Sequence, residues 1–292
     1  MKKRVFVVLF MLGLCYLLFK IEPFLQENVK IKSLRQSYNS GSSQHLSAQT
    51  MRKIHVEKSD MYQGNLLLVN KQFAVRQESV RTDIVNLFDH QNLMQGYGVL
   101  DNNIRLSEEV VQRFMDMVAA ASKDGVKDFL ISSGYRDFKQ QNVLYEEMGS
   151  EYALPAGNSE HNLGLSLDVG STQSKMSEAP EGRWIEKNAW KYGFVLRYPK
   201  DKIDITGIKY EPWHIRYVGL PHSVIMHERN YVLEEYLRYL QDERKISVKV
   251  KGKVYTISYY PASQTQTIEV PINRQHEISG DNTGGIIVTV YD

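Results

Sequence analysis

SEHNLGLSLDV, residues 159–169, joins a polar turn to an alternating strand and decides the fold around it. Every second residue from Leu165 to Val169 is apolar, whereas Ser166 and Asp168 between them are polar. Side chains of a strand point alternately to opposite faces, so the apolar ones enter a core and the polar pair faces away from it. A carboxylate costs much free energy to bury without a partner. We therefore expect Asp168 to point into a polar cleft.

A second segment rich in reactive side chains is EPWHIR, residues 211–216. As a strand, it places His214 and Arg216 on one face and Ile215 on the other. Glu211 comes just before this strand, where its carboxylate is free to act as a proton acceptor.

Together the two segments contain the parts of a zinc enzyme. Catalytic zinc is held by three side chains drawn from His, Asp or Glu, with a further position open to water. His161, Asp168 and His214 supply such a set, so we expect them to bind one Zn²⁺ per chain, with Glu211 beside the water as the base. A histidine next to an aspartate is more often a hydrogen-bonded pair in a core, and either segment alone would favour that interpretation.

The composition limits the other classes of protein. The chain has 292 residues, of which 42% are hydrophobic and 24% charged, enough for one core and one or two domains. A net charge of +2 excludes a strongly basic nucleic-acid binder. The sequence has one cysteine, Cys15, which excludes intramolecular disulfides. Because Cys15 lies in an apolar run, thiol catalysis is also disfavoured.

The N-terminus has the pattern of a membrane-targeting segment. The cations of residues 2–4 precede an uncharged apolar run, residues 5–19, which at 15 residues is shorter than the roughly 20 that span a bilayer comfortably. No small-x-small cleavage site follows Lys20, so we expect residues 1–25 to be an uncleaved single-pass anchor; a cleaved signal is the alternative. The flanking charges place the rest of the chain outside the cell membrane.

Composition divides the remainder into three parts. Residues 26–60 are polar and poor in aromatics, which indicates a linker. Residues 61–244 form the expected compact domain. Residues 245–292 contain β-branched alternating runs and are expected to form a small β appendage, with no catalytic residues of its own.

Within residues 61–244, helical and strand patterns alternate with short turns. This predicts an α+β fold in which helices flank a central antiparallel sheet. Ser107 is the expected N-cap of a helix that ends at Gly125. The remaining expected elements are a strand at 129–131, helices at 138–148 and 184–192, a strand at 194–197 and a long amphipathic helix at 223–241.

The motifs resemble those of a known family. His-x6-Asp in the first segment and Glu-x-Trp-His in the second are similar to the metal signature of the VanY-type zinc D,D-carboxypeptidases of peptidase family M15. The resemblance covers roughly residues 62–241. It includes SSGYR at 132–136, Gln141, EMGSEYALPAG at 147–157 and WKYGF at 190–194.

This resemblance implies a LAS-type α+β peptidase that binds Zn²⁺ and releases D-alanine from peptidoglycan stem peptides ending in D-Ala-D-Ala. It implies that Arg136 stabilises the developing oxyanion and contacts the substrate, and that Gln141 and Ser159 help to hold the substrate's free carboxylate. Without the resemblance, the sequence would favour a surface ion pair as the role of Arg136 and a turn cap as the role of Ser159. Because vancomycin binds such peptides, trimming them removes the drug's target and implies a part in vancomycin resistance.

Three alternatives differ in class. A serine-type carboxypeptidase needs Ser-x-x-Lys and Lys-Thr-Gly motifs, and the sequence has neither. An endopeptidase of the same fold would cut cross-links and need no free carboxylate. A non-catalytic cell-wall-binding module would keep the zinc cleft without a base, whereas Glu211 is present.

Overall fold

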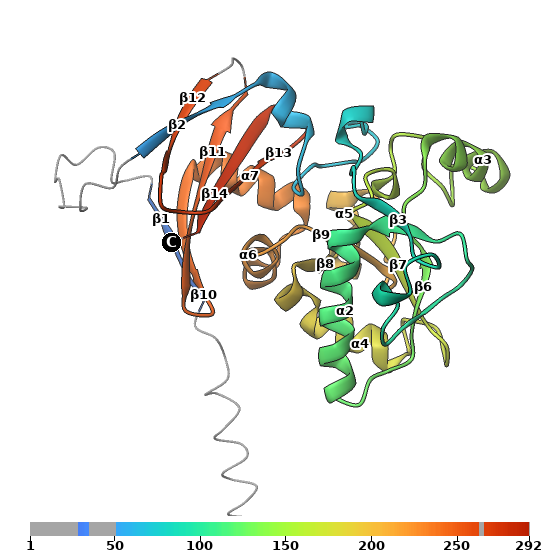
Figure 1. The fold of residues 1–292 in the computed structure, drawn as a ribbon. Helices are drawn as coiled ribbons and strands as arrows, with labels where there is room; N and C mark the ends of the chain where they lie inside the picture. Colours follow the sequence, from blue (N-terminus) through green and yellow to red (C-terminus); the bar gives the residue numbers. More distant parts are fainter. Residues whose placement is uncertain (1–28, 35–50, 263–265, 292) are drawn as a thin grey trace, which may run out of the picture.

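The computed structural model describes residues 29–34, 51–262 and 266–291, and Figure 1 shows two sheet regions with helices between and around them. The predicted anchor at residues 5–19 lies outside the described residues. Among the residues described, no helix has the length and apolar character needed to cross a bilayer.

The sheet predicted from the two motif segments has five strands in the order β4-β6-β7-β9-β8. Their bounds are Gly98–Val99 (β4), Phe129–Ser133 (β6), Ser166–Ser171 (β7), Phe194–Leu196 (β8) and His214–Tyr217 (β9). The pairings β6–β7, β7–β9 and β8–β9 are antiparallel, whereas β4 and β6 are parallel. The α+β class is confirmed, but the sheet is mixed rather than wholly antiparallel, because a helix carries the chain back between β4 and β6.

That connecting helix is α2, Glu108–Lys123, and it begins as predicted, since the Ser107 hydroxyl accepts a hydrogen bond from the backbone N–H of Val110. Helix α3, Phe138–Met148, also has the predicted bounds, with Asp137 and Gln140 forming a capping box. A short two-stranded sheet, β3 (Ile84–Asn86) with β5 (Arg105–Ser107), precedes α2.

Two helix predictions need correction. The helix expected at 184–192 begins earlier, as α4 (Pro180–Asn188), and its last turn is the 3-10 helix η7 (Ala189–Tyr192). The single helix expected at 223–241 is two helices, α6 (His222–Arg229) and α7 (Leu233–Glu243). The break lies at Asn230, whose φ of 51° is left-handed, and the Glu235 carboxylate accepts a hydrogen bond from the backbone N–H of Val232.

The second sheet region contains the C-terminal strands and part of the predicted linker. It has the antiparallel order β1-β10-β11-β14-β13, and a separate pair joins β12 to β2. The bounds are Lys30–Ser33 (β1), Met51–Val56 (β2), Lys245–Val250 (β10), Lys253–Pro261 (β11), Gln266–Pro271 (β12), His276–Gly280 (β13) and Gly285–Tyr291 (β14). Strands β1 and β2 lie within the predicted linker, residues 26–60, and their backbones complete the edges of C-terminal sheets.

The remaining short elements are helix α5 (Ile203–Thr206) and five further 3-10 helices among the described residues. The latter are η3 (Lys58–Tyr62), η4 (Gln77–Ser79), η5 (Gln91–Leu93), η6 (Glu160–Asn162) and η8 (Lys200–Lys202).

Each sheet has its own apolar core. The mixed sheet packs against α2 and α4 through residues such as Phe114, Phe129 and Ile215. The C-terminal sheet packs against α6 and α7, which lie between the two sheets in Figure 1, through residues such as Leu240 and Ile246. Strands β7 and β9, which contain Asp168 and His214, lie inside the mixed sheet and not at its edges.

Candidate metal centre

Strand register brings the two motif segments together. In the antiparallel pair β7–β9, Asp168 lies directly opposite His214. Leu165, Leu167 and Val169 lie in the apolar core, as predicted, whereas Ser166, which is also buried, donates its hydroxyl to the Glu160 carboxylate. His161 lies on η6, just before β7.

The three predicted ligands converge. His161 Nε2 is 3.4 Å from Asp168 Oδ2, and His214 Nδ1 is 3.1 Å from Asp168 Oδ1. One donor atom from each of the three residues lies within 4.8 Å of the others. Donors about 2.0–2.1 Å from a tetrahedral zinc ion lie roughly 3.3 Å apart, so these separations fit Zn²⁺.

The imidazole of His161 is oriented by a neighbouring carbonyl. His161 Nδ1 lies 2.7 Å from the Gly134 oxygen, to which it donates, and this leaves Nε2 without a proton and free to bind the metal. The imidazole of His214 has the opposite orientation: Nδ1 faces Asp168, and Nε2 is 3.5 Å from the carboxylate of Glu160.

The charges around the centre favour a cation. Burial raises the pKa of Asp168, but the two imidazoles outweigh burial and hold that pKa well below its ordinary value. Burial lowers the pKa of His214, but the neighbouring carboxylates of Asp168 and Glu160 outweigh it and raise the pKa to about 9. Because the carboxylates stabilise a positive charge at this point, the donor set suits a divalent metal ion.

Glu211 lies where the sequence predicted a base. Its Oε2 is 3.8 Å from His214 Nδ1, and its backbone N–H donates to the Tyr198 carbonyl at 3.1 Å. Burial raises the pKa of Glu211, and the negative charges of Asp168 and Glu160 raise it further. A carboxylate with a raised pKa accepts a proton more readily near neutral pH.

Arg136 faces the same space. Every predicted site residue lines one cavity of about 490 Å³, and Arg136 forms part of its wall. The backbone N–H of Arg136 donates to the His161 carbonyl at 3.2 Å, which fixes the residue beside the metal ligands. Its Nε is buried and, among the described residues, has no hydrogen-bond partner. A buried guanidinium donor without a partner is suited to an anionic substrate group.

The two expected carboxylate-binding residues also line this cavity. Ser159 precedes η6, and its side chain makes no capping hydrogen bond there, so it does not serve as the turn cap. Gln141 is buried and donates from Nε2 to the Leu154 carbonyl at 2.6 Å. Within the described part of the chain, its Oε1 is buried without a partner.

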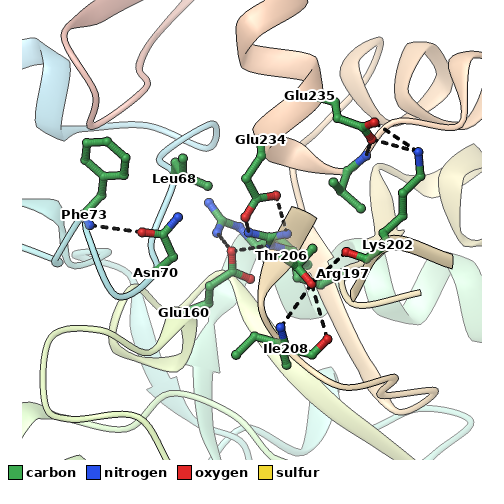
Figure 2. A network of polar contacts seen from close by, with 12 residues as sticks. Leu68, Asn70, Phe73, Glu160, Arg197, Lys202, Thr206, Ile208, Glu234 and Glu235 are labelled. Carbon is green, nitrogen blue, oxygen red and sulfur yellow. Dashed lines mark hydrogen bonds and ion pairs between the residues drawn. The ribbon is translucent and has the colours of Figure 1, made fainter. Parts of the chain in front are cut away.

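The sequence analysis missed two kinds of residue at this site. Trp213 and Tyr152 line the cavity with 41% and 77% of their surfaces exposed, and so form a wall open to solvent. Figure 2 shows an ion network in which Arg197 joins Glu160 to Glu234, and Glu160 in turn faces the metal ligand His214. Glu160 stands inside the first motif, but no periodicity pairs it with an arginine 37 residues away.

A His–Asp–His ligand set with the half-buried Glu211 beside it, in an α+β fold, defines a zinc metallopeptidase, and His161, Asp168 and His214 are its zinc ligands. Comparison with known proteins refines this class. The family model of VanY, D-alanyl-D-alanine carboxypeptidase, matches residues 103–220. The chain is 56% identical over 297 aligned positions to a D-alanyl-D-alanine carboxypeptidase of Enterococcus faecium, with 99% of this chain and 96% of the relative covered. The chain therefore belongs to the VanY family of D-alanyl-D-alanine carboxypeptidases.

Two solved structures agree with this assignment. The vancomycin-resistance D,D-dipeptidase VanXYg, solved in complex with a D-Ala-D-Ala phosphinate analogue, is 30% identical with a TM-score of 0.73, over 83% of this chain and 100% of that one. VanYB, solved in complex with D-alanine-D-alanine, is 29% identical with a TM-score of 0.50, over 60% of this chain and 97% of that one.

Proposed function

We propose that this protein is a zinc-dependent D,D-carboxypeptidase that removes the terminal D-Ala from peptidoglycan stem pentapeptides ending in D-Ala-D-Ala. One observation carries the proposal: a His–Asp–His donor set, the Glu211 carboxylate and Arg136, whose Nε has no hydrogen-bond partner among the described residues, share one cavity. The printed names of the E. faecium relative and of the VanYB complex support the choice of substrate.

The proposed mechanism assigns a role to each residue of the cavity. His161, Asp168 and His214 hold Zn²⁺, which when bound acts as a Lewis acid toward water and the substrate carbonyl. Glu211 accepts a proton from the attacking water and passes it to the nitrogen of the leaving D-alanine, for which its raised pKa is suited. The peptide bond breaks between the two D-alanines.

Arg136 supplies positive charge where the oxyanion develops. Arg136 is half-buried in the cavity wall and its Nε is buried, so that water screens the interaction less than it would at the surface. Ser159 and Gln141 contribute to the subsite for the free carboxylate, the group that separates a carboxypeptidase from an endopeptidase. Gln141 also fixes the Leu154 backbone at the cavity wall.

We also propose a cell-membrane location, with residues 5–19 as the anchor and the catalytic part outside the cytoplasm. The cationic and apolar N-terminal pattern supports this location. Stem peptides exposed outside the membrane would then be accessible, and their trimming would remove the D-Ala-D-Ala termini to which vancomycin binds.

The test is release of D-alanine from stem peptides with different C-termini, measured with and without a chelator. We expect release from peptides ending in D-Ala-D-Ala, loss of release with the chelator and no effect of penicillin. Amidation of the terminal carboxylate should suppress release. Binding of the peptide without release would instead support a cell-wall-binding module, and cleavage of amidated or cross-linked peptides would support an endopeptidase.

A further inference from the structure

The second metal-binding imidazole has a carboxylate behind it. His214 is buried, and its Nδ1 faces Asp168 at 3.1 Å. When Nδ1 binds a metal, the proton of the neutral imidazole must lie on Nε2. Among the described residues, Nε2 has no hydrogen-bond partner, and the carboxylate oxygen facing it is Glu160 Oε2 at 3.5 Å.

The two oxygens of Glu160 have different partners. Oε1 pairs with Arg197 Nε and with Arg216 Nη1, both at 2.8 Å. Oε2 accepts a hydrogen bond from the Ser166 hydroxyl at 3.0 Å and is the oxygen that faces His214. The two arginines thus fix the carboxylate through one oxygen and leave the other directed at the imidazole.

The wider network keeps this carboxylate charged and in place. Glu160, Arg197 and Arg216 are each at most 2% exposed. Arg197 forms a two-bond ion pair with Glu234 on α7, at 2.7 and 2.9 Å (Figure 2). The two carboxylates, Glu160 and Glu234, balance the charges of the two arginines, so the buried network has no net charge.

We infer that Glu160 is a positioning residue for the zinc site: it accepts the Nε2 proton of His214 and so directs Nδ1 toward the metal. The 3.5 Å separation is longer than the usual N–H···O range, and a shift of a few tenths of an ångström closes it. His161 has the matching support from the Gly134 carbonyl, so both imidazoles are held by the ring nitrogen that does not bind the metal.

Zinc affinity of purified protein, measured by chelator competition, tests this role without reference to turnover. We expect Glu160→Gln to weaken zinc binding by about 10–100-fold, the range for loss of a group that orients a metal-binding histidine. The matched control is Glu234→Gln, which removes the same charge from the other side of Arg197 and does not touch His214. The control should lose thermal stability but keep wild-type zinc affinity.

A second variant covers the case in which Glu160→Gln does not fold. Glu160→Asp keeps the charge for both arginines but withdraws it from His214 by about one C–C bond, roughly 1.5 Å, and should also weaken zinc binding. Wild-type zinc affinity in the folded Glu160 variants, or an equal loss in Glu234→Gln, would overturn the inference. The inference rests on the zinc centre of the proposed function and not on its substrate, so a failure to release D-alanine would leave this test valid.

Discussion

The two sheets bury different kinds of side chain. Behind the metal ligands of the mixed sheet, the buried residues include the ion network of Glu160, Arg197 and Arg216. The C-terminal sheet buries aliphatic residues against α6 and α7, such as Ile246 and Val248. A buried ion pair often contributes less to stability than an apolar pair of the same volume. Part of the buried interior beside the mixed sheet therefore orients reactive groups, whereas the buried residues of the C-terminal sheet stabilise the fold by apolar packing.

The largest loss of activity should follow from replacing Glu211, the proposed base at the mixed-sheet site. Glu211→Ala should lower kcat by about 10²–10⁴-fold, because the proton acceptor is lost, while zinc stays bound. Steady-state D-alanine release and elemental analysis check both parts. Glu228→Ala, an exposed glutamate on α6, is the control and should act as wild type. Near-normal turnover in Glu211→Ala would remove Glu211 from the mechanism.

Replacement of the cavity arginine should have a somewhat smaller effect. Arg136→Ala should lower kcat by about 10²–10³-fold, the range for loss of one oxyanion-stabilising donor. Arg183→Ala, an exposed arginine on α4, is the matched control. If only KM rises in Arg136→Ala, the guanidinium binds the ground state and does not stabilise the transition state.

The metal ligands and Glu211 show how far the sequence alone could go, whereas the role of Arg136 followed only from the family resemblance. The motif spacing predicted the ligands and the base because strand alternation fixes which side chains share a face, and the structure places them in one cavity. The expected cap at Ser107 similarly allowed the start of α2 to be placed.

Most of the misses depend on contacts between residues distant in sequence, and one depends on local backbone conformation. β1 and β2 become strands because C-terminal strands pair with them, and their own polar composition does not indicate it. The break at Asn230 depends on left-handed backbone that apolar periodicity does not encode. The partners of Glu160 come from β9 and from the residue that follows β8, so no local pattern reveals them.

The stability of the protein should depend on pH through His222, which lies where α6 packs against α7 and the C-terminal sheet. His222 Nδ1 lies 2.7 Å from the Tyr236 hydroxyl, Nε2 lies 3.1 Å from that of Thr289, and burial lowers the pKa of His222 to about 3. The unfolded chain binds this proton near pH 6.5 and the folded chain does not, so stability is full above pH 6.5 and falls as the pH drops toward 3.

Between pH 6.5 and 5 this histidine should cost about 2 kcal/mol of unfolding free energy, at roughly 1.4 kcal/mol per pH unit. Urea unfolding at both pH values measures the change. His222→Gln cannot take up the proton and should flatten the slope. An unchanged slope in that variant would assign the pH effect to other groups.

The smallest effect should follow from a small deletion in the apolar core. Ile246→Val removes one buried methylene between the C-terminal sheet and its helices, and should cost about 0.5–1.5 kcal/mol of unfolding free energy. Zinc affinity and turnover should not change. A clear loss of zinc affinity would show that the C-terminal sheet positions the site and would contradict the division between the two regions.

The central claim is that one zinc ion is held by His161, Asp168 and His214, with Glu211 beside it. Anomalous diffraction at the zinc edge from crystals of the zinc-loaded protein tests this claim most directly. The account predicts a single strong peak about 2.0–2.2 Å from His161 Nε2, His214 Nδ1 and an Asp168 oxygen. A peak elsewhere in the molecule, or one bound by Nε2 of His214, would contradict it.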